Sequence, residues 1–543
     1  MNQPDSEHDI ADKLLHKGDY SEAFKIFNGI VCKNPNDIRG WVGIGMYMIM
    51  TLQFNEARAN FEFIIQQEPN HALAWYGLAQ THYNMGNSYE ACKAIDQASS
   101  IAPNSSSIQL FRAICYAALG ATPEQVCELF KCWGECFSDP ITDSSPQFSA
   151  PEYNEQNINK KLKIGYVSAD LRFHPVAFFM EPVFAKHNKS TCEIYVFNNY
   201  SSKDSYSNRI ESYVDHWFDI YDKTDDEVYA LIKENSIDIL IDLSGHTMGN
   251  RLSVFARRAA PVQATWLGYM YPTGMKAIDY RITSFKLAPP GLEQSFNEHL
   301  FRMTAGAVYA PPLPVNISAE PPMVKNGYPT LISLNHSRKV SDQMLELWRR
   351  ILLARPLAKL IILTKEITQE KAFENLLPRL EKLDLPLERV FISKEIPLYE
   401  FMTLSDVADI QLDTHPISGG TTTLHAIWMG LPIVALSGGS SMSNSSASIL
   451  NMCKLGEFNT ENEDAYFYKV LDLIDNEEKI RNFRANSQKH LQDSPLMDYV
   501  GFATELEKSF RLMWINHLLQ HKKYLDSSHD IDLMVEHCNE TTS

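Results

Sequence analysis

The chain has 543 residues and a formal net charge of −18 at pH 7, with 49 Lys and Arg against 67 Asp and Glu. That length is more than a single hydrophobic core supports, so we expect three or four domains. The acidic balance disfavours nucleic acid as a partner, because contacts to backbone phosphates need a basic surface.

The sequence also disfavours a membrane protein and a metal site. The longest apolar stretch, residues 41–50, is too short to span a bilayer, and the acidic start lacks the pattern of a secretion signal. We therefore expect a soluble, cytoplasmic protein without membrane insertion. The nine cysteines include one cluster, Cys127, Cys132 and Cys136, which has neither a CxxC pair nor a nearby histidine. This cluster predicts buried thiols rather than a zinc site.

The first quarter of the chain carries a repeat of 34 residues. Pro35, Pro69 and Pro103 each precede an asparagine at this spacing. The same spacing relates three further sets: Ala23, Ala57 and Ala91; Glu22, Glu56 and Glu90; Trp41 and Trp75. A 34-residue helix–turn–helix period is the signature of tetratricopeptide repeats. We expect three units over about 5–104 and a fourth, degenerate one from 106, within a repeat region 1–138. The repeats either cap the next domain or form a groove that holds a polypeptide.

After the repeats the pattern changes to that of two α/β domains. The stretch 139–160 is rich in Pro, Ser and Asn and reads as a linker. Apolar strand-like runs then alternate with helical ones, which predicts parallel sheets covered by helices on both faces. The predicted strands are 163–168, 193–199 and 237–244, then, after a Pro-rich connection, 330–335, 359–364, 389–393, 408–413 and 432–436. We expect an N-terminal lobe over 161–312, a C-terminal lobe over 326–524, and a mobile tail at 525–543.

Polar residues follow four of the predicted strands. Asp170 and His174 come after the first strand, His246 after the third, and Arg338 and Lys339 after the strand at 330–335. The stretch GGTTT follows the strand at 408–413. Because ligands bind doubly wound folds at the carboxyl ends of the strands, we expect these four exits to face one cleft between the lobes.

The GGTTT stretch has the features of an anion site. Thr421, Thr422 and Thr423 open a helix that ends at Gly430, while Gly419 and Gly420 permit close approach of a ligand. Free N–H groups and the helix dipole favour a phosphate there. The chain has no GxxxxGK[ST] motif, so a nucleotide diphosphate that departs as a leaving group fits better than a P-loop ATPase. Lys339 would then supply positive charge.

Four stretches, together with the repeats, resemble one known family. They are IGYVSADLRFHPVAFF (164–179), LIDLSGHTMGNRLSVFARRAAPVQATWLGYMYPTG (240–274), AIDYRIT (277–283) and LDTHPISGGTTTLHAIWMGLPIV (412–434). They resemble the O-linked N-acetylglucosamine transferase and SPINDLY proteins of glycosyltransferase family 41. The resemblance covers most of the chain, and it implies a GT-B fold with two Rossmann-like lobes. It also implies an inverting transfer of a sugar without a metal or other cofactor, and a protein acceptor that docks partly through the repeats.

The resemblance assigns roles to individual residues. His174 matches the active-site histidine of the family's HP motif, His246 matches that of its GHT motif, and Lys339 matches the lysine that neutralises the diphosphate. These three are the catalytic candidates. The candidates for binding the nucleotide sugar are His336, Lys339, Phe401, Gly419, Gly420, Thr421, Thr422 and His425, with no metal ligand among them.

The chain also departs from the family pattern. His425 stands where relatives carry a carboxylate that accepts from ribose hydroxyls, and Asn444 stands where many have an arginine. Leu398 and Phe401 replace a lysine and a base-stacking histidine of the animal enzymes, although Phe401 can still stack.

The expected function is the transfer of N-acetylglucosamine from UDP-N-acetylglucosamine to Ser or Thr of intracellular proteins. Three alternatives stay open. The first is a GDP-fucose-dependent protein O-fucosyltransferase, as in the plant SPINDLY branch. The second is a non-catalytic repeat scaffold with a degenerate transferase domain. The third is an asparagine-directed glucosyltransferase, which is disfavoured because the known members carry a different helical domain in place of the repeats.

Overall fold

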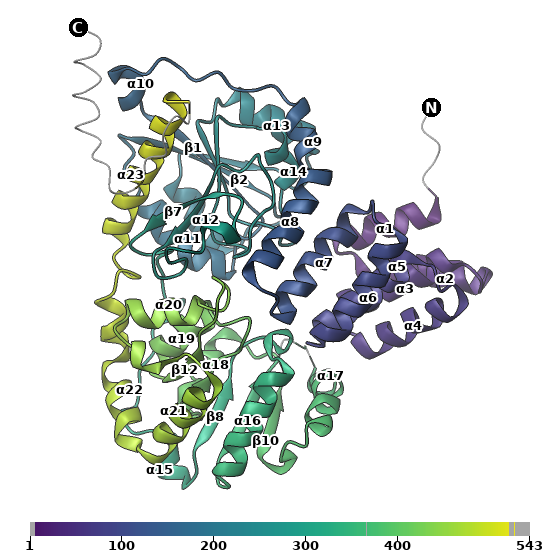
Figure 1. Ribbon diagram of the computed structural model, residues 1–543, viewed down its shortest axis with the longest axis vertical. Coiled ribbons are helices and arrows are strands. Elements are labelled where there is room, and N and C mark those ends of the chain that lie inside the picture. Colours follow the sequence, from purple (N-terminus) through teal and green to yellow (C-terminus); the bar gives the residue numbers. More distant parts are fainter. Residues whose placement is uncertain (1–5, 365, 367, 521–525, 527–543) are drawn as a thin grey trace.

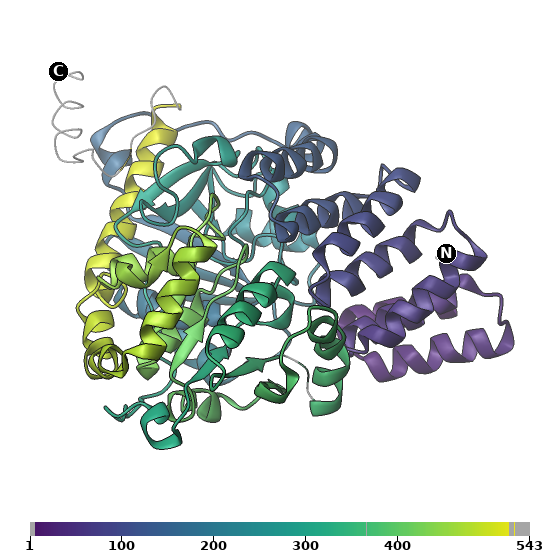
Figure 2. The ribbon, with the colours of Figure 1, turned by 60° about the horizontal axis from the view of Figure 1, so that its bottom comes forward.

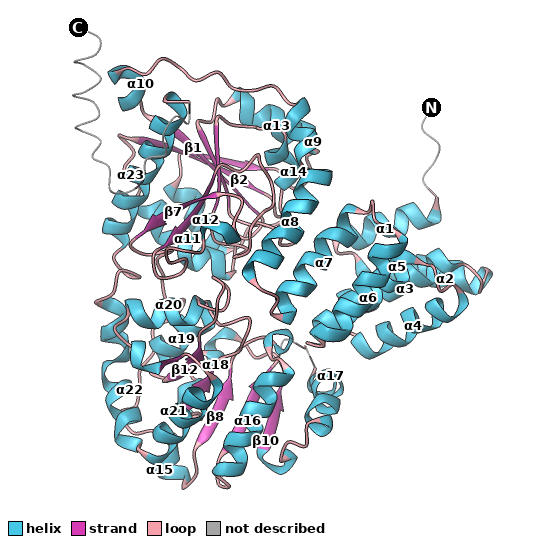
Figure 3. Cartoon of the chain, viewed as in Figure 1, coloured by secondary structure: helices cyan, strands magenta, loops and turns pink. Residues whose placement is uncertain are grey.

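The computed structural model describes residues 6–364, 366, 368–520 and 526. A helical arm projects from two stacked α/β lobes, and strands occur only in the lobes (Figures 1 and 3). This arrangement confirms the predicted fold class. The predicted tail, 525–543, lies outside the described residues except for Asp526.

The arm consists of eight helices in four antiparallel pairs. They are α1 (Glu7–Lys17), α2 (Tyr20–Lys33), α3 (Ile38–Met50), α4 (Phe54–Gln67), α5 (Ala72–Asn84), α6 (Ser88–Ile101), α7 (Ser106–Leu119) and α8 (Pro123–Phe137). Ala23, Ala57 and Ala91 are fully buried, as expected for positions where two helix backbones approach closely. The fourth pair, α7 and α8, is the degenerate repeat that the sequence predicts. Of the cysteine cluster on α8, Cys127 is buried as expected, whereas Cys132 and Cys136 are exposed.

A tight contact joins the second and third repeats. The ring of Phe61 on α4 is fully buried. A Cβ atom built on Gly45 or Gly77 would lie only 2.5 or 2.2 Å from that ring. The two glycines therefore make the room that lets a large aromatic side chain fill the space between α3, α4 and α5.

The predicted linker, 139–160, is more ordered than its composition suggests. It contains α9 (Asp139–Ser144) and α10 (Glu155–Asn159). The Thr142 hydroxyl donates to the carbonyl of Ala256 at 2.8 Å, and Ile158 is fully buried. The prediction of an irregular linker is therefore wrong. Helices this short have no room for a periodic pattern, so the sequence does not reveal them.

The N-terminal lobe contains a seven-stranded parallel sheet in the order β3-β2-β1-β4-β5-β6-β7. The strands are β1 (Leu162–Ser168), β2 (Cys192–Asn198), β3 (His216–Asp219), β4 (Ile239–Asp242), β5 (Val262–Thr265), β6 (Tyr280–Ser284) and β7 (His299–Met303). In this sheet Ile164 pairs with both Ile194 and Ile239. The helices are α11 (Pro175–Lys186), α12 (Ser205–Tyr213), α13 (Asp225–Glu234), α14 (Leu252–Ala256) and η1 (Glu293–Ser295).

The C-terminal lobe contains a six-stranded parallel sheet in the order β10-β9-β8-β11-β12-β13. The strands are β8 (Thr330–Ser333), β9 (Lys359–Leu363), β10 (Val390–Ser393), β11 (Ile410–Leu412), β12 (Ile433–Leu436) and β13 (Asn459–Thr460). The helices before the GGTTT stretch (419–423) are α15 (Pro322–Asn326), η2 (Ser337–Lys339), α16 (Asp342–Ala354), α17 (Gln369–Lys382), η3 (Leu387–Arg389), α18 (Leu398–Phe401) and η4 (Leu404–Asp406). Those after it are α19 (Thr421–Met429), α20 (Ser445–Met452), η5 (Gly456–Phe458), α21 (Glu463–Asp475), α22 (Glu477–Gln492) and α23 (Tyr499–Leu518).

The last helix, α23, belongs to the N-terminal lobe although it follows the C-terminal one in sequence (Figure 1). Its Trp514 Nε1 donates to the carbonyl of Asn157 at 2.9 Å, and its Asn516 amide donates to the Tyr280 hydroxyl at 3.0 Å. The prediction of a C-terminal lobe running from 326 to 524 is therefore wrong at its end. An apolar helix shows that it is buried, but its sequence does not say against which sheet.

Candidate active site

Both sheets change their strand order at one point, and the four predicted strand exits lie at these two points. In the N-terminal lobe the order reverses between β1 and β4, and in the C-terminal lobe between β8 and β11. The exits bring the two lobes together: Phe178 on α11, which follows β1, lies 5.9 Å from the ring of His425 on α19, which follows β11. The carboxyl ends of the strands at a reversal are where doubly wound folds bind ligands.

The loop from Asp413 to Gly420 is shaped by hydrogen bonds to its own start. The Asp413 Oδ1 accepts from the Gly419 N–H and from the Asn335 amide, both at 2.9 Å. The same Asn335 accepts from the Thr422 hydroxyl at 2.9 Å. A Cβ atom on Gly419 would lie 2.8 Å or less from the hydroxyls of Thr422 and Thr423, so only glycine fits there.

The three threonines of α19 differ in their contacts. The Thr423 hydroxyl is paired with the Ser446 hydroxyl at 2.7 Å, and the Thr422 hydroxyl is held by Asn335. Thr421 is half-buried at the first helical position, and its hydroxyl bonds to no described residue. No described side chain caps this helix, because its N-cap residue is Gly420. The uncapped N–H groups and the Thr421 hydroxyl are therefore available to an anion.

Lys339 reaches this loop from η2, which follows β8. Its Nζ donates to the carbonyl of Ser418 at 3.1 Å. Burial lowers the pKa of Lys339 to about 8, and burial likewise raises the pKa of Asp413. The attraction between the two charges opposes both shifts. This contact places Lys339 beside the loop that leads into α19. His336, three residues earlier, caps η2 by accepting from the Arg338 N–H at 3.1 Å.

His174 lies at the first turn of α11, where its side chain caps the helix. Its Nδ1 accepts from the N–H of Val176 at 3.3 Å and lies 3.7 Å from Asp170 Oδ1. Burial raises the pKa of Asp170. A neutral imidazole that accepts at Nδ1 carries its proton on Nε2. The backbone of α11 thus holds the ring at the start of the helix, close to the carboxyl group of Asp170.

His246 packs against the repeat arm and not against the loop at 413–420. Its ring stacks on Phe130 of α8 with centroids 5.2 Å apart, and it meets Trp133 of the same helix edge-on at 5.0 Å. Its Nε2 lies 2.8 Å from the carbonyl of Thr273, and burial lowers its pKa to about 4. The neutral ring therefore donates to Thr273 and fills the contact between the repeat arm and the N-terminal lobe. Its hydrogen bond and ring contacts with described residues involve only the arm and the N-terminal lobe.

His425 is enclosed by aromatic rings from separate elements. Phe178, Tyr309 and Phe401 lie 5.9, 5.7 and 5.7 Å from it, measured between ring centroids. The Tyr309 hydroxyl lies 2.6 Å from its Nδ1, and burial lowers the pKa of His425 to about 3. The ring is therefore neutral, with one donor and one acceptor nitrogen. A carboxylate at this position could only accept.

The polar residues that support the loop were not among the predicted site residues. Asn335 and Asp413 were available as signals, because each is the polar last residue of a predicted strand. Asn444 stands at the N-cap position of α20, but its side chain accepts from the Gly438 N–H, at 3.3 Å, rather than from the helix. Within the described part of the chain, no group of three or more His, Cys, Asp or Glu side chains is arranged to hold a metal ion. No helix described is long and apolar enough to cross a membrane.

Comparisons with known proteins agree with this geometry. The family model for glycosyl transferase family 41 matches residues 141–308 and 330–506, and a tetratricopeptide repeat model matches residues 53–122. Among curated proteins, the chain is similar to the "probable UDP-N-acetylglucosamine–peptide N-acetylglucosaminyltransferase SPINDLY" of Solanum lycopersicum. The two are 32% identical over 399 residues, which are 72% of this chain and 42% of that protein. The protein of the same name from Arabidopsis thaliana is 31% identical over 400 residues, 72% of this chain and 43% of its own length. The chain thus matches about two fifths of the length of these relatives.

One solved structure matches nearly the whole chain. It is a point mutant of the Thermobaculum terrenum O-GlcNAc transferase, which is 26% identical with a TM-score of 0.85. The match covers 96% of this chain and 100% of that one. The likeness therefore includes the repeat arm as well as the two lobes.

Proposed function

We propose a function from one premise: the chain belongs to glycosyl transferase family 41, whose model matches most of both lobes. The protein transfers N-acetylglucosamine from UDP-N-acetylglucosamine to Ser or Thr hydroxyls of proteins, with inversion at the sugar carbon. The observation that carries this proposal is the contact between Lys339 and Ser418. It sets a half-buried cation beside an uncapped helix N-terminus, which suits a departing diphosphate.

The proposed reaction follows from these positions. The acceptor oxygen attacks the anomeric carbon as the bond to the diphosphate oxygen breaks, so the configuration inverts and the hydroxyl proton leaves to a base. Negative charge grows on the diphosphate, where Lys339 and the N-terminus of α19 stabilise it more than they stabilise the bound donor. We propose that this stabilisation requires no metal. We propose that His174 holds the sugar or the acceptor in place from its position at the start of α11.

The nucleotide is proposed to lie between the two points at which the strand orders of the sheets reverse. Its diphosphate binds at the Thr421 hydroxyl and the uncapped N–H groups at the start of α19, and its ribose lies beside His425. The Gly419 N–H and the Thr422 hydroxyl, which donate to Asp413 and Asn335, shape this site. Phe401 can contact the base. The acceptor is a protein that the repeat arm helps to hold. The geometry at Lys339 argues against a non-catalytic scaffold, because a desolvated cation beside an uncapped helix N-terminus suits an anion.

The first test is nucleotide binding measured by calorimetry. We expect UDP and UDP-N-acetylglucosamine to bind more tightly than GDP and GDP-fucose. The substitution Thr421→Val removes one hydrogen bond to a charged group and should weaken UDP binding by about 1.5 to 3 kcal/mol, roughly ten- to a hundredfold. As a control, Thr504→Val makes the same change on the exposed side of α23 and should leave binding unaltered. Tighter binding of GDP would overturn the proposed donor, and an unchanged affinity in Thr421→Val would remove this helix from the site.

A further inference from the structure

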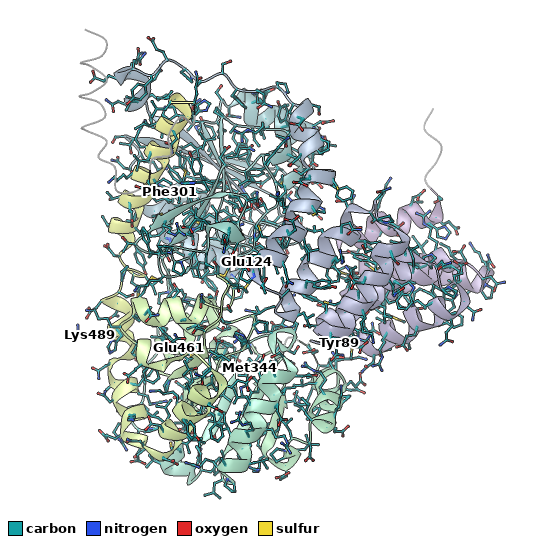
Figure 4. All side chains as sticks on the ribbon, viewed as in Figure 1. Tyr89, Glu124, Phe301, Met344, Glu461 and Lys489 are labelled. Atoms are coloured by element: carbon teal, nitrogen blue, oxygen red, sulfur yellow. The ribbon has the colours of Figure 1, made fainter. Side chains whose placement is uncertain are left out.

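The repeat arm touches the C-terminal lobe at the loop that carries Lys339. Figure 2 shows the arm packed beside the lobes, and Figure 4 labels two arm residues, Glu124 and Tyr89, where the arm adjoins them. On the arm side the contact is the turn between α5 and α6, and on the lobe side it comprises η2 and α17. The guanidinium of Arg338 lies 5.9 Å from the centre of the Tyr83 ring.

One buried arginine joins these segments. Arg379 on α17 has a relative exposure of 6%. Its Nη1 donates to the carbonyl of Met85 at 3.2 Å, and its Nη2 donates to the carbonyl of Val340 at 2.8 Å. Its Nε and Nη2 both donate to Asp342 Oδ1, at 3.0 and 2.6 Å. Val340 directly follows Lys339, so this guanidinium fixes the chain on the C-terminal side of the lysine and ties it to the arm.

The arm approaches this arginine closely because of one glycine. Gly86 has φ +79°, and a Cβ atom there would lie 2.5 Å from Arg379 Nη1 and 3.1 Å from the carbonyl of Ser337. A second contact lies further along α17, where the Lys371 ammonium pairs with Glu56 of α4 at 2.5 Å. The first contact reaches η2 itself, whereas the second one involves only α17 and the arm.

We propose that Arg379 is a positioning residue for Lys339, and that the turn at Met85 and Gly86 of the repeat arm is part of the same support. The arm then sets the geometry of the donor site in addition to holding an acceptor. This inference rests on the proposed function, since it concerns the lysine that faces the diphosphate. It follows that deleting the arm would not separate acceptor binding from donor chemistry, because the deletion also removes the partner of Arg379.

The test uses two glycines with the same backbone conformation. Gly86→Ala inserts a methyl group against Arg379 and Ser337. Gly18→Ala puts the same strain into the matching turn of the first repeat, where φ is +83° and no other atom lies within 4 Å of the new methyl group. The full-length variants are compared for hydrolysis of UDP-N-acetylglucosamine with water as acceptor, so that acceptor docking does not contribute. Hydrogen exchange of the peptide 336–341 and thermal unfolding are measured on the same samples.

We expect Gly86→Ala to lower the kcat of hydrolysis by roughly ten- to a hundredfold, because a small displacement of a catalytic group has effects of that size. Its KM should change far less, and exchange at 336–341 should accelerate. The substitution Arg379→Lys keeps the positive charge but loses the planar guanidinium with its several N–H donors. It should therefore also lower kcat and accelerate exchange at 336–341. Gly18→Ala and Lys371→Met should leave kcat and exchange as in the wild type.

Two outcomes would count against the inference. Normal exchange at 336–341 in folded Gly86→Ala would overturn it whether or not the protein turns over a sugar nucleotide. A normal kcat in that variant would overturn it as well. If the wild-type protein neither hydrolyses a sugar nucleotide nor transfers its sugar, that result would count against the proposed function instead. The exchange experiment would still decide the role of Gly86 and Arg379.

Discussion

At the scale of single residues, Lys339 is a cation held in a largely buried position beside a carboxylate. Arg338 and Asp413 are the charged groups that act on it, the first lowering and the second raising its pKa. A lysine with a pKa of about 8 is charged below that pH and loses its charge as the pH rises through it. The positive charge that we propose to stabilise the leaving diphosphate is therefore lost in mildly alkaline solution.

We accordingly predict that kcat/KM of the free enzyme falls above about pH 8. In Lys339→Arg the fall in kcat/KM should be absent up to pH ~10, because a guanidinium stays charged there. The value of kcat/KM itself should be lower than in the wild type. Lys339→Met should reduce kcat by about a hundredfold or more at pH 7, by analogy with loss of an oxyanion-hole donor. The measurement is a pH–rate profile of donor hydrolysis. An alkaline limb that persists in Lys339→Arg would assign this ionisation to another group.

The residues of the site were only partly predictable. Lys339, His174 and the GGTTT stretch follow strands that the sequence marks clearly, so their common location could be expected. His246 follows a strand in the same way but lies against Phe130 and Trp133 of the arm. The sequence cannot reveal that placement, because it depends on how the arm docks.

At the scale of elements, all eight predicted strands are present, whereas β3, β5, β6, β7 and β13 were missed, and two of these share a feature. β5 and β6 are fully buried yet interrupted by polar residues. The Gln263 amide donates to the carbonyls of Phe255 and Ala277, and the Arg281 guanidinium donates to those of Tyr269 and Tyr271. Buried polar groups that are satisfied by loop carbonyls break the apolar run by which a buried strand is recognised.

Among the helices, the packing of the arm makes a specific prediction at Phe61. Replacing this fully buried ring by alanine removes a large apolar contact between α4 and its neighbours and leaves a cavity. We expect Phe61→Ala to destabilise the arm by about 3–5 kcal/mol. Scanning calorimetry should show the loss as an earlier transition of the arm, separate from that of the lobes.

The matched control is Phe63→Ala on the same helix, because Phe63 is 43% exposed. It meets Trp41 edge-on and should cost less than about 1.5 kcal/mol. Equal destabilisation by the two substitutions would show that the glycine-lined space at Gly45 and Gly77 does not depend on the ring that fills it.

At the scale of the whole molecule, two connections hold the parts together. The arm lies against both lobes, through α8 on the N-terminal one and through the α5–α6 turn on the C-terminal one. Helix α23 returns from the C-terminal lobe to the N-terminal lobe. The site at the junction therefore depends on contacts that are far apart in sequence, which is why the strand patterns located the site but not its supports.

The attachment of α23 to the N-terminal lobe can be tested at Glu507. Its carboxylate accepts from Asn188 N–H at 2.8 Å, His187 Nδ1 at 3.0 Å and the Thr191 hydroxyl at 3.1 Å. Burial alone would raise the pKa of Glu507, but these hydrogen bonds outweigh it and hold the pKa below its ordinary value. A carboxylate with a lowered pKa stabilises the fold above its unfolded pKa of about 4.3, and this contribution is lost as the pH falls through the folded value. We predict that Glu507→Gln lowers the free energy of unfolding at pH 7 by about 1–3 kcal/mol. The difference from wild type should shrink steadily below pH ~4.

Denaturant unfolding at pH 7 and below pH ~4 measures this difference in the free energy of unfolding, with Glu477→Gln on the exposed start of α22 as the control. A difference that stays constant with pH would mean that shape, and not the charge of Glu507, attaches α23 to the N-terminal lobe.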